Sequence, residues 1–440
     1  MKLENQKNML NSKNIPSKMY TLLTELFPIC RSITGDGVRE TLSLLQNHLK
    51  NLKIYEISSG TKCFDWEVPD EWNIKEAYII APDGKKIADF SVNNLHVLNY
   101  SIPVDKSIDL GELQKHLYSL PDQPTAIPYV TSYYDRKWGF CLEHNTRKSL
   151  KPGKYHVYIN SKINPGSLTY GELIIPGKSK KEIFLSTYIC HPSMANNELS
   201  GPVVTCFLAN WLLSRKDLKY TYRIIFIPET IGSIVYLSRN LKRLKKNVIA
   251  GFNVTCVGDE GVYSFLPSRD GNTLSDILAK HVLHHLHPDY KEYTYLDRGS
   301  DERQYCSPGV DLPISSIMRS KYSSYPEYHT SLDNLDFVTP DGLYGSYKTI
   351  KYCLECLERN EILSNTVLCE PHLGSRGLYP TTNAVNLSGA PLVLDLLAYC
   401  DGNTSLLEIA ILLDIPMLDL IDLVNQLKES QLLVNSIRSR

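Results

Sequence analysis

Helical spacing of apolar residues marks the start of the chain, before about residue 52. Val38, Leu42, Leu45 and Leu49 recur three and four residues apart, after a Thr-Gly-Asp-Gly turn that suits the start of a helix. Because this spacing puts the apolar side chains on one face, it predicts a helix packed against a core, with a second helix before it.

Between about residues 52 and 160, short alternating runs replace the helical pattern. EAYIIAPDGKKIADFSV has Pro-Asp-Gly between two runs, which predicts a turn between strands, and KYHVYINSKI alternates in the same way. This segment therefore predicts a mostly β unit.

From about residue 168, buried strands alternate with helices. The apolar runs EIFLSTYIC (182–190), YRIIFIPE and VIAGFNVTCVG predict strands, and GPVVTCFLANWLLSR and SIVYLSRNLKRLKK predict helices. This alternation is typical of an α/β fold in which a largely parallel sheet has helices on both faces. Ligands bind at the carboxyl ends of strands in such sheets, so the residues after each run are candidates for a site.

The tail follows a Pro/Gly-marked connection at 369–383 and predicts three short helices. Its middle is typical of a helix-turn-helix, with Ser405 as N-cap, Ile409 and Leu412 inside the helix, and Ile415-Pro416 as a break.

Composition argues against several classes of protein, including nucleic-acid-binding, membrane-spanning and disulfide-rich ones. Lys and Arg number 47 against 48 acids, so no charge imbalance indicates nucleic acid or a membrane surface as the main partner. Eleven cysteines lack disulfide-dense spacing, and the start has no apolar signal segment. No stretch reaches the roughly 18 apolar residues of a membrane span. We therefore expect a soluble, cytoplasmic protein with reduced thiols.

The stretch STYICHPSMANNELSGP (186–202) carries the first candidate chemistry. His191 and Glu198 lie seven residues apart on one strand-to-helix loop, and an imidazole and a carboxylate placed there can converge on a cation such as zinc. The alternative is a hydrogen-bonded loop histidine beside a helix-capping Asn-Glu pair.

Two later residues extend this candidate site. Glu229 ends a fully apolar strand in FIPETIGS, where a carboxylate near a metal can take a proton from water; the alternative is a first-turn acid favoured by the helix dipole. His329, in SSYPEYHTSLDNLDFV, would present a late imidazole to the metal, and the alternative is a surface loop residue.

Together these segments resemble the zinc aminopeptidase, glutaminyl cyclase and carboxypeptidase clan. FPICRSITGDGVRETL, DWEVPDEW, IPYVTSYY, WGFCL, TCVGD and LGSRGLYP are further similar to a bacterial subgroup with an inserted β domain and a C-terminal winged helix. The resemblance implies an aminopeptidase-like catalytic domain at 1–51 and 161–370. It also implies an insertion at 52–160 and a winged-helix-like domain at 371–440.

The chain departs from the clan at three metal-ligand positions. Asn197 stands at the bridging Asp, Thr230 at the second Glu and Thr255 at the later Asp. Two metals about 3.5–4 Å apart need a bridging carboxylate, so the resemblance implies one zinc ion here. Its expected ligands are then His191, Glu198 and His329 with a water, or Asn197 in place of Glu198, and Glu229 keeps the position of the general base.

Substrate-reading groups are expected from 266–271 and 295–309. Arg269, Arg298 and Arg303 are candidates for binding a carboxylate or phosphate, although surface charge is the alternative for at least one of them, and Asp301 or Glu302 could bind a free amine. The remaining residues of the predicted substrate-binding set are Asn197 and Tyr328.

These interpretations predict a zinc-dependent hydrolase that cleaves an amide or peptide-like bond in a small substrate. Two alternatives stay open: a binding or scaffold protein whose peptidase site has lost turnover, and a glutaminyl-cyclase-like acyl transfer. The helix 281–287 places His281, His284 and His285 on one face, but no carboxylate lies within this segment, so an exposed helix face is favoured there.

The predicted winged helix is acidic where a DNA-binding helix is basic. Asp419, Asp422 and Glu429 outnumber the single Lys428, so phosphate contacts would be repelled. We expect no nucleic acid partner, and instead a homo-oligomer contact or protein docking through this domain.

Overall fold

An eight-stranded sheet organises the larger of two compact units in the computed structural model, which describes residues 14–376 and 389–436. The four central strands are parallel, and antiparallel neighbours flank them on both sides. The three predicted buried strands are all among these four, which confirms the largely parallel sheet. In spatial order the strands are β1 (Lys53–Ser58), β10 (Ser167–Ile175), β12 (Tyr220–Ile227), β11 (Ser179–Tyr188), β13 (Val248–Asn253), β16 (Ile314–Met318), β14 (Ser264–Leu266) and β15 (Lys291–Glu292).

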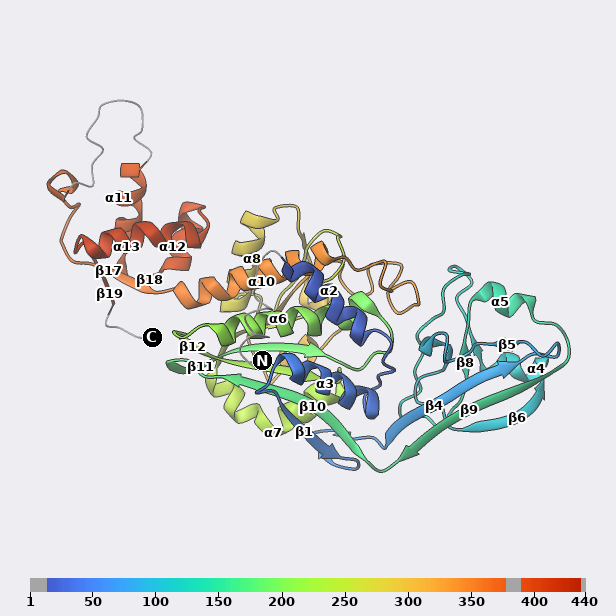
Figure 1. Ribbon diagram of the computed structural model, residues 1–440. Coiled ribbons are helices and arrows are strands. Elements are labelled where there is room, and N and C mark those ends of the chain that lie inside the picture. The colour runs from blue at the N-terminus through green and yellow to red at the C-terminus, as the bar shows by residue number, and fades with distance from the viewer. Residues whose placement is uncertain (1–13, 377–388, 437–440) are drawn as a thin grey trace. The chain divides into compact units, whose positions relative to one another are not determined.

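Helices cover both faces of this sheet, with α6 on one face and α7 on the other (Figure 1). The residues from Ser200 to Leu212 of α6 are all buried, which explains why its sequence is apolar all round. In α3 the predicted apolar stripe is buried, and Val38, Leu42 and Leu45 have no exposed surface. The helices of this unit are α2 (Ile15–Leu26), α3 (Asp36–His48), α6 (Ser200–Ser214), α7 (Ile231–Asn247) and α9 (Glu302–Tyr305). Two more, α8 (Leu274–Leu286) and α10 (Pro340–Arg359), begin in this unit and continue in the second.

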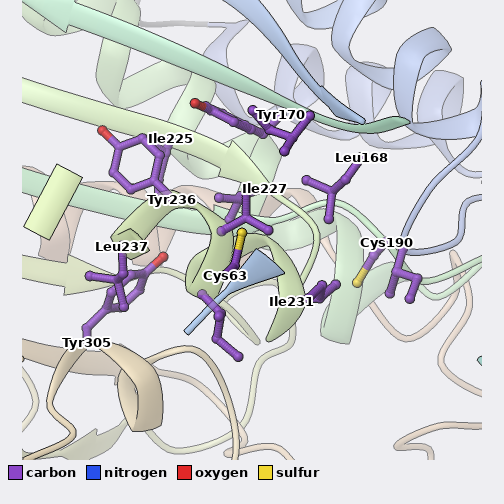
Figure 2. Close-up of a cluster of buried hydrophobic side chains, with 14 of the residues drawn as sticks. Cys63, Leu168, Tyr170, Cys190, Ile225, Ile227, Ile231, Tyr236, Leu237 and Tyr305 are labelled. Atoms are coloured by element: carbon purple, nitrogen blue, oxygen red, sulfur yellow. The ribbon is translucent and has the colours of Figure 1, made fainter. Parts of the chain in front are cut away.

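The segment predicted as an insertion contains a four-stranded sheet with its own apolar core, which includes Ala77, Phe140 and Val157. β1 also lies within this segment, yet it pairs with β10 in the large sheet, and Cys63 packs in the core of the large sheet near Ile227 and Ile231 (Figure 2). The elements are β2 (Lys62–Cys63), β3 (Trp66–Glu67), β4 (Glu71–Ile80), β5 (Lys86–Ile87), β6 (Val104–Asp109), α4 (Leu110–Leu113), β7 (Leu117–Tyr118), β8 (Phe140–Cys141), α5 (His144–Ser149) and β9 (Lys154–Asn164).

A second compact unit comprises Ile277–Asp289 and Thr349–Arg440. It holds a three-stranded antiparallel sheet and the short helices expected for the tail, and Ser405 caps α12 in a reciprocal capping box with Glu408. β17 lies before the predicted boundary at residue 371. The elements are β17 (Ile362–Asn365), α11 (Gly389–Tyr399), β18 (Asp401–Ser405), α12 (Leu406–Leu413), α13 (Ile421–Glu429) and β19 (Leu433–Asn435).

None of the helices in the described ranges 14–376 and 389–436 is long and apolar enough to cross a membrane. All eleven cysteines are free thiols. Cys369 is exposed and Cys30 half-buried, and the others are buried among apolar side chains.

A buried ion pair joins two central strands. Arg223 on β12 donates from Nε to Glu182 on β11 over 2.6 Å, and both side chains are almost fully buried. Desolvation raises the pKa of Glu182, but the hydrogen bonds and charge of Arg223 outweigh it, and the net pKa lies below the ordinary 4.5. The ionised pair is therefore the native form at neutral pH.

Replacing Glu182 by Gln should lower the free energy of unfolding by about 1–3 kcal/mol at pH 7, because Arg223 keeps its buried charge and loses one of its two carboxylate partners, while Glu172 remains. The folded-state pKa is depressed, so the stabilisation is present above about pH 4.5 and is lost as pH falls through the lower folded-state value. Urea unfolding of both proteins from pH 7 to pH 3 measures this. The exposed pair Lys62–Glu67 is the control, and Lys62→Ala should cost under about 1 kcal/mol. Equal stability of the Glu182→Gln variant and the parent at pH 7 would contradict the prediction.

Candidate active site

His191 lies just beyond the carboxyl end of β11, where the sheet topology predicts a ligand site, and is 3% exposed. Its Nδ1 is 2.9 Å from Oε2 of Glu198, which lies in a single π-helical turn, Ala195–Leu199, that opens α6. Burial, with a smaller effect of the Arg31 charge, lowers the pKa of His191 to about 3. The ring is therefore neutral, and with Nδ1–H donating to Glu198, the lone pair of Nε2 is free.

Arg31, from the loop between α2 and α3, forms an ion pair with Glu198. Its Nε is 3.4 Å from Glu198 Oε1 and donates to the His191 carbonyl oxygen over 2.9 Å. Both charged side chains have no exposed surface. Burial raises the pKa of Glu198 to about 8, and the charge of Arg31 opposes that rise and favours the ionised form that accepts the Nδ1 proton of His191.

Glu229 follows β12 and approaches the other nitrogen of His191. Its Oε2 is 3.7 Å from His191 Nε2, and its backbone N–H donates to Cys190 Sγ over 3.3 Å. Its side chain is 20% exposed, so solvent reaches it. Burial, followed by the nearby Asp301 charge, raises the pKa of Glu229 to about 8, which makes it a stronger proton acceptor than an ordinary glutamate.

His329 contributes a second imidazole to the same site. Its ring centroid lies 5.2 Å from that of His191, and its Nε2 is buried without a hydrogen-bond partner. The predicted substrate residue Tyr328 stacks on this ring at 3.9 Å. Burial, with a smaller effect of His191, lowers the pKa of His329 to about 3, so this ring is also neutral. A free, neutral imidazole nitrogen is a good metal ligand.

Asp333 ties the His329 loop to the π-helical turn. Its carboxylate accepts hydrogen bonds from the backbone N–H groups of Asn196 (2.6 Å) and Asn197 (2.9 Å). An acid that caps the first turn of a helix satisfies N–H groups that would otherwise lack partners. The spacing between the two loops therefore depends on this one side chain.

Neutral side chains, Asn197, Thr230 and Thr255, occupy the three positions that the resemblance assigned to metal-ligating carboxylates. The Tyr188 hydroxyl donates to Asn197 Oδ1 over 2.9 Å and lies 2.5 Å from Thr255 Oγ1. Thr230, whose φ of +62° is in the left-handed region, accepts a hydrogen bond from Arg303. Among residues 14–376, these three positions therefore offer no carboxylate that could bridge two metal ions.

The structure brings only some of the predicted substrate residues to this site. Asp301 lies beside Glu229 and accepts from the Thr230 N–H over 2.8 Å, and its Oδ2 has no partner. Arg269 instead pairs with Asp311 on the surface, and exposed Arg298 lies over the ring of Tyr295. The described contacts of Arg269 are with Cys306 and Asp311, and those of Arg298 with Tyr295 in its own loop, in agreement with the surface alternative.

Tyr129 is a site residue that the sequence reasoning missed. It comes from the segment predicted as an insertion, and its ring centroid lies 5.2 Å from those of both His191 and His329. Its backbone N–H donates to the His329 carbonyl oxygen over 2.8 Å, and its hydroxyl lies 2.8 Å from that of Tyr133. The only sequence signal was the string IPYVTSYY, which marked a resemblance without a role.

The chain belongs to the family described as Domain of unknown function (DUF4910), which residues 20–360 match. Residues 361–435 match a winged helix-turn-helix family. A Clostridium acetobutylicum protein described as a putative polysaccharide biosynthesis protein with aminopeptidase-like domain is 45% identical over 414 residues, covering 92% of this chain and 94% of that protein.

Solved structures confirm the predicted fold. A putative peptidase from Clostridium acetobutylicum is similar with a TM-score of 0.91 and 42% identity, covering 99% of this chain and 100% of the other. A zinc aminopeptidase from Bacillus subtilis is similar with a TM-score of 0.55 at 14% identity, covering 78% of this chain and 94% of the other. The predicted aminopeptidase-like α/β fold with a C-terminal winged helix is therefore correct.

Replacing Arg31 by Met should lower the free energy of unfolding by about 3–5 kcal/mol, because Glu198 would remain as a buried charge without its partner. Adding Glu198→Gln to Arg31→Met should recover part of this loss, since the unpaired charge is then gone. Urea unfolding of the two single variants and the double variant measures the coupling. Strictly additive losses would show that the two side chains act independently.

Proposed function

We propose that this protein is a hydrolase that uses one zinc ion to cleave an amide or peptide-like bond in a small substrate. The proposal rests on one observation: the buried, neutral imidazoles of His191 and His329 lie beside the solvent-accessible carboxylate of Glu229. The aminopeptidase-like fold and the peptidase names among similar proteins support it.

The residues present fit one zinc ion on the Nε2 side of His191. The orphaned Nε2 of His329 and the free Nε2 of His191 are ligand atoms that zinc prefers, with Glu229 near them. Glu198, which the sequence suggested as a ligand, lies on the Nδ1 side next to the Arg31 cation. A dication there would be repelled, so we assign Glu198 the role of orienting His191, as carboxylates do behind many metal-binding histidines.

The chain's own groups divide the proposed reaction between them. Zinc, when bound, would polarise the scissile carbonyl and activate water. Glu229 takes the proton from the attacking water and returns it to the leaving amine, for which a raised pKa suits it. Asp301 and Arg303, which flank Thr230, are placed to bind polar groups of the substrate.

A binding protein without turnover is the second candidate. The observation in its favour is the replacement of three clan carboxylates by Asn197, Thr230 and Thr255, whose side-chain oxygens are hydrogen-bonded within the protein. Acyl transfer by one zinc on this fold, as in glutaminyl cyclase, would use the same imidazoles. Zinc content and the effect of Glu229 on turnover separate the enzymatic proposals from the binding protein.

In the proposed enzyme, changing both His191 and His329 to Ala should remove one equivalent of zinc per chain. Glu229→Gln should keep that zinc and lower amide hydrolysis by roughly 10²–10⁴-fold, because the proton acceptor is lost. Metal analysis and turnover of a panel of aminoacyl amides and N-acyl sugars measure the two effects. Glu76→Gln, an exposed change in β4, is the control. Unchanged zinc in the double variant, or full activity in Glu229→Gln, would contradict the proposal.

We propose an amide-bearing sugar of a polysaccharide precursor as the substrate class. A relative's name refers to polysaccharide biosynthesis, and a groove of about 600 Å³ is lined by Tyr100, Tyr133 and Tyr134. Sugar rings pack on aromatic faces through their C–H groups. The Tyr133 hydroxyl lies 2.8 Å from that of Tyr129, which contacts both site imidazoles, so this groove borders the proposed site.

Tyr134, whose side chain is half-exposed on this groove, should affect substrate binding and not chemistry. Tyr134→Ala should raise KM for an N-acyl sugar about fivefold or more with kcat unchanged, since it removes binding that is equal in ground and transition states. Tyr344→Ala, on α10, is the matched aromatic control. Equal KM values for Tyr134→Ala and the parent protein would rule out this groove as the sugar site.

For the winged helix we propose protein docking or self-association, and no nucleic acid. Lys428, the one lysine of α13, is paired with Glu361 at 2.6 Å, so its charge is already compensated. Asp419 and Asp422 remain as net negative charge on this part of the surface, which disfavours a phosphate backbone.

A further inference from the structure

A second set of metal-ligating side chains lies in the C-terminal unit, whereas the proposed active site belongs to the larger unit. The sequence placed His284 and His285 on α8 without a carboxylate nearby. The folded chain supplies one: Asp414, which ends α12 in a left-handed conformation with φ +53°. α8 from Ile277 onward and α12 belong to the same compact unit.

The three ligand atoms converge at the spacing that a metal requires. Asp414 Oδ1 is 3.0 Å from His284 Nε2 and 4.0 Å from His285 Nε2, and all three atoms lie within 4.8 Å of one another. Ligands about 2.0–2.1 Å from a tetrahedral zinc lie roughly 3.3–3.4 Å apart, a value between these two distances. Small side-chain rotations would therefore bring all three ligand atoms within bonding distance of one ion.

Neighbouring contacts hold this arrangement in place. His281, one turn before His285, accepts a hydrogen bond on Nε2 from the backbone N–H of Met417 over 3.1 Å. Its ring packs edge-on against that of His285 with centroids 4.7 Å apart. His281 thereby fixes α8 against the turn that follows Asp414, and its own Nε2 is used for that contact.

We propose that His284, His285 and Asp414 form a surface site for a divalent transition metal that prefers imidazole nitrogen, such as zinc. Two histidines and one carboxylate are a common zinc ligand set, and water would complete the coordination. His284 and Asp414 are 60% and 76% exposed, so an ion can enter without unfolding. Bound metal would link α8 to the end of α12 and stabilise the C-terminal unit.

The test uses the full-length chain without a histidine tag and with His191→Ala and His329→Ala, so that the proposed catalytic ligands are absent. Isothermal titration with zinc should show one equivalent bound per chain. Asp414→Asn, which keeps the shape and the left-handed preference, and His284→Ala should each weaken zinc affinity at least tenfold. The circular dichroism spectrum of each variant checks that it is folded.

His156→Ala is the matched control, because His156 is similarly exposed but faces a single carboxylate, Asp105, at 3.4 Å. Its zinc affinity should equal that of the background protein. Absence of saturable zinc binding in the background, or zinc affinity unchanged in folded Asp414→Asn, would overturn the proposal. Because both imidazoles of the proposed catalytic site are removed throughout, this result is independent of whether the enzyme proposal holds.

Discussion

The line of contacts from Arg31 through Glu198 to His191 is the constraint on which the site depends. The buried Arg31 guanidinium opposes the effect of burial on the pKa of Glu198, and the ionised Glu198 that it favours directs the His191 proton to Nδ1. Only then is Nε2 free on the side where Glu229 lies. Without that buried cation, the imidazole would have no fixed tautomer and the carboxylate no reason to remain charged in an apolar core.

The need of each buried charge for a compensating partner also explains how the chain differs from two-metal enzymes of this fold. Asn197, Tyr188 and Thr255 bond to one another, so the Asn197 amide oxygen and the two hydroxyls have partners without a cation. A site built with three carboxylates at these positions would need metals to offset their repulsion. Neutral side chains at these positions remove that requirement.

Tertiary contacts from distant segments complete the site. The 127–133 segment contributes Tyr129, which touches both imidazoles, and Asp333 joins the His329 loop to the π-helical turn. These residues carry no recognisable spacing relative to His191, so periodicity has nothing to detect. The site is thus shared between the large sheet and the segment predicted as an insertion, and changes in either should be felt at the imidazoles.

Local patterns in the sequence determined the strands β11, β12 and β13, the helices between them and the capped α12, because apolar periodicity and capping act over a few residues. They also placed His191 and Glu229 at strand ends, where parallel topology gathers ligands. Only the folded chain decided which nitrogen of His191 faces Glu198, that Arg269 pairs with Asp311, and that Asp414 meets His284. Those outcomes depend on distances between segments more than a hundred residues apart, or on the direction of a side chain, and neither is encoded in spacing along the chain.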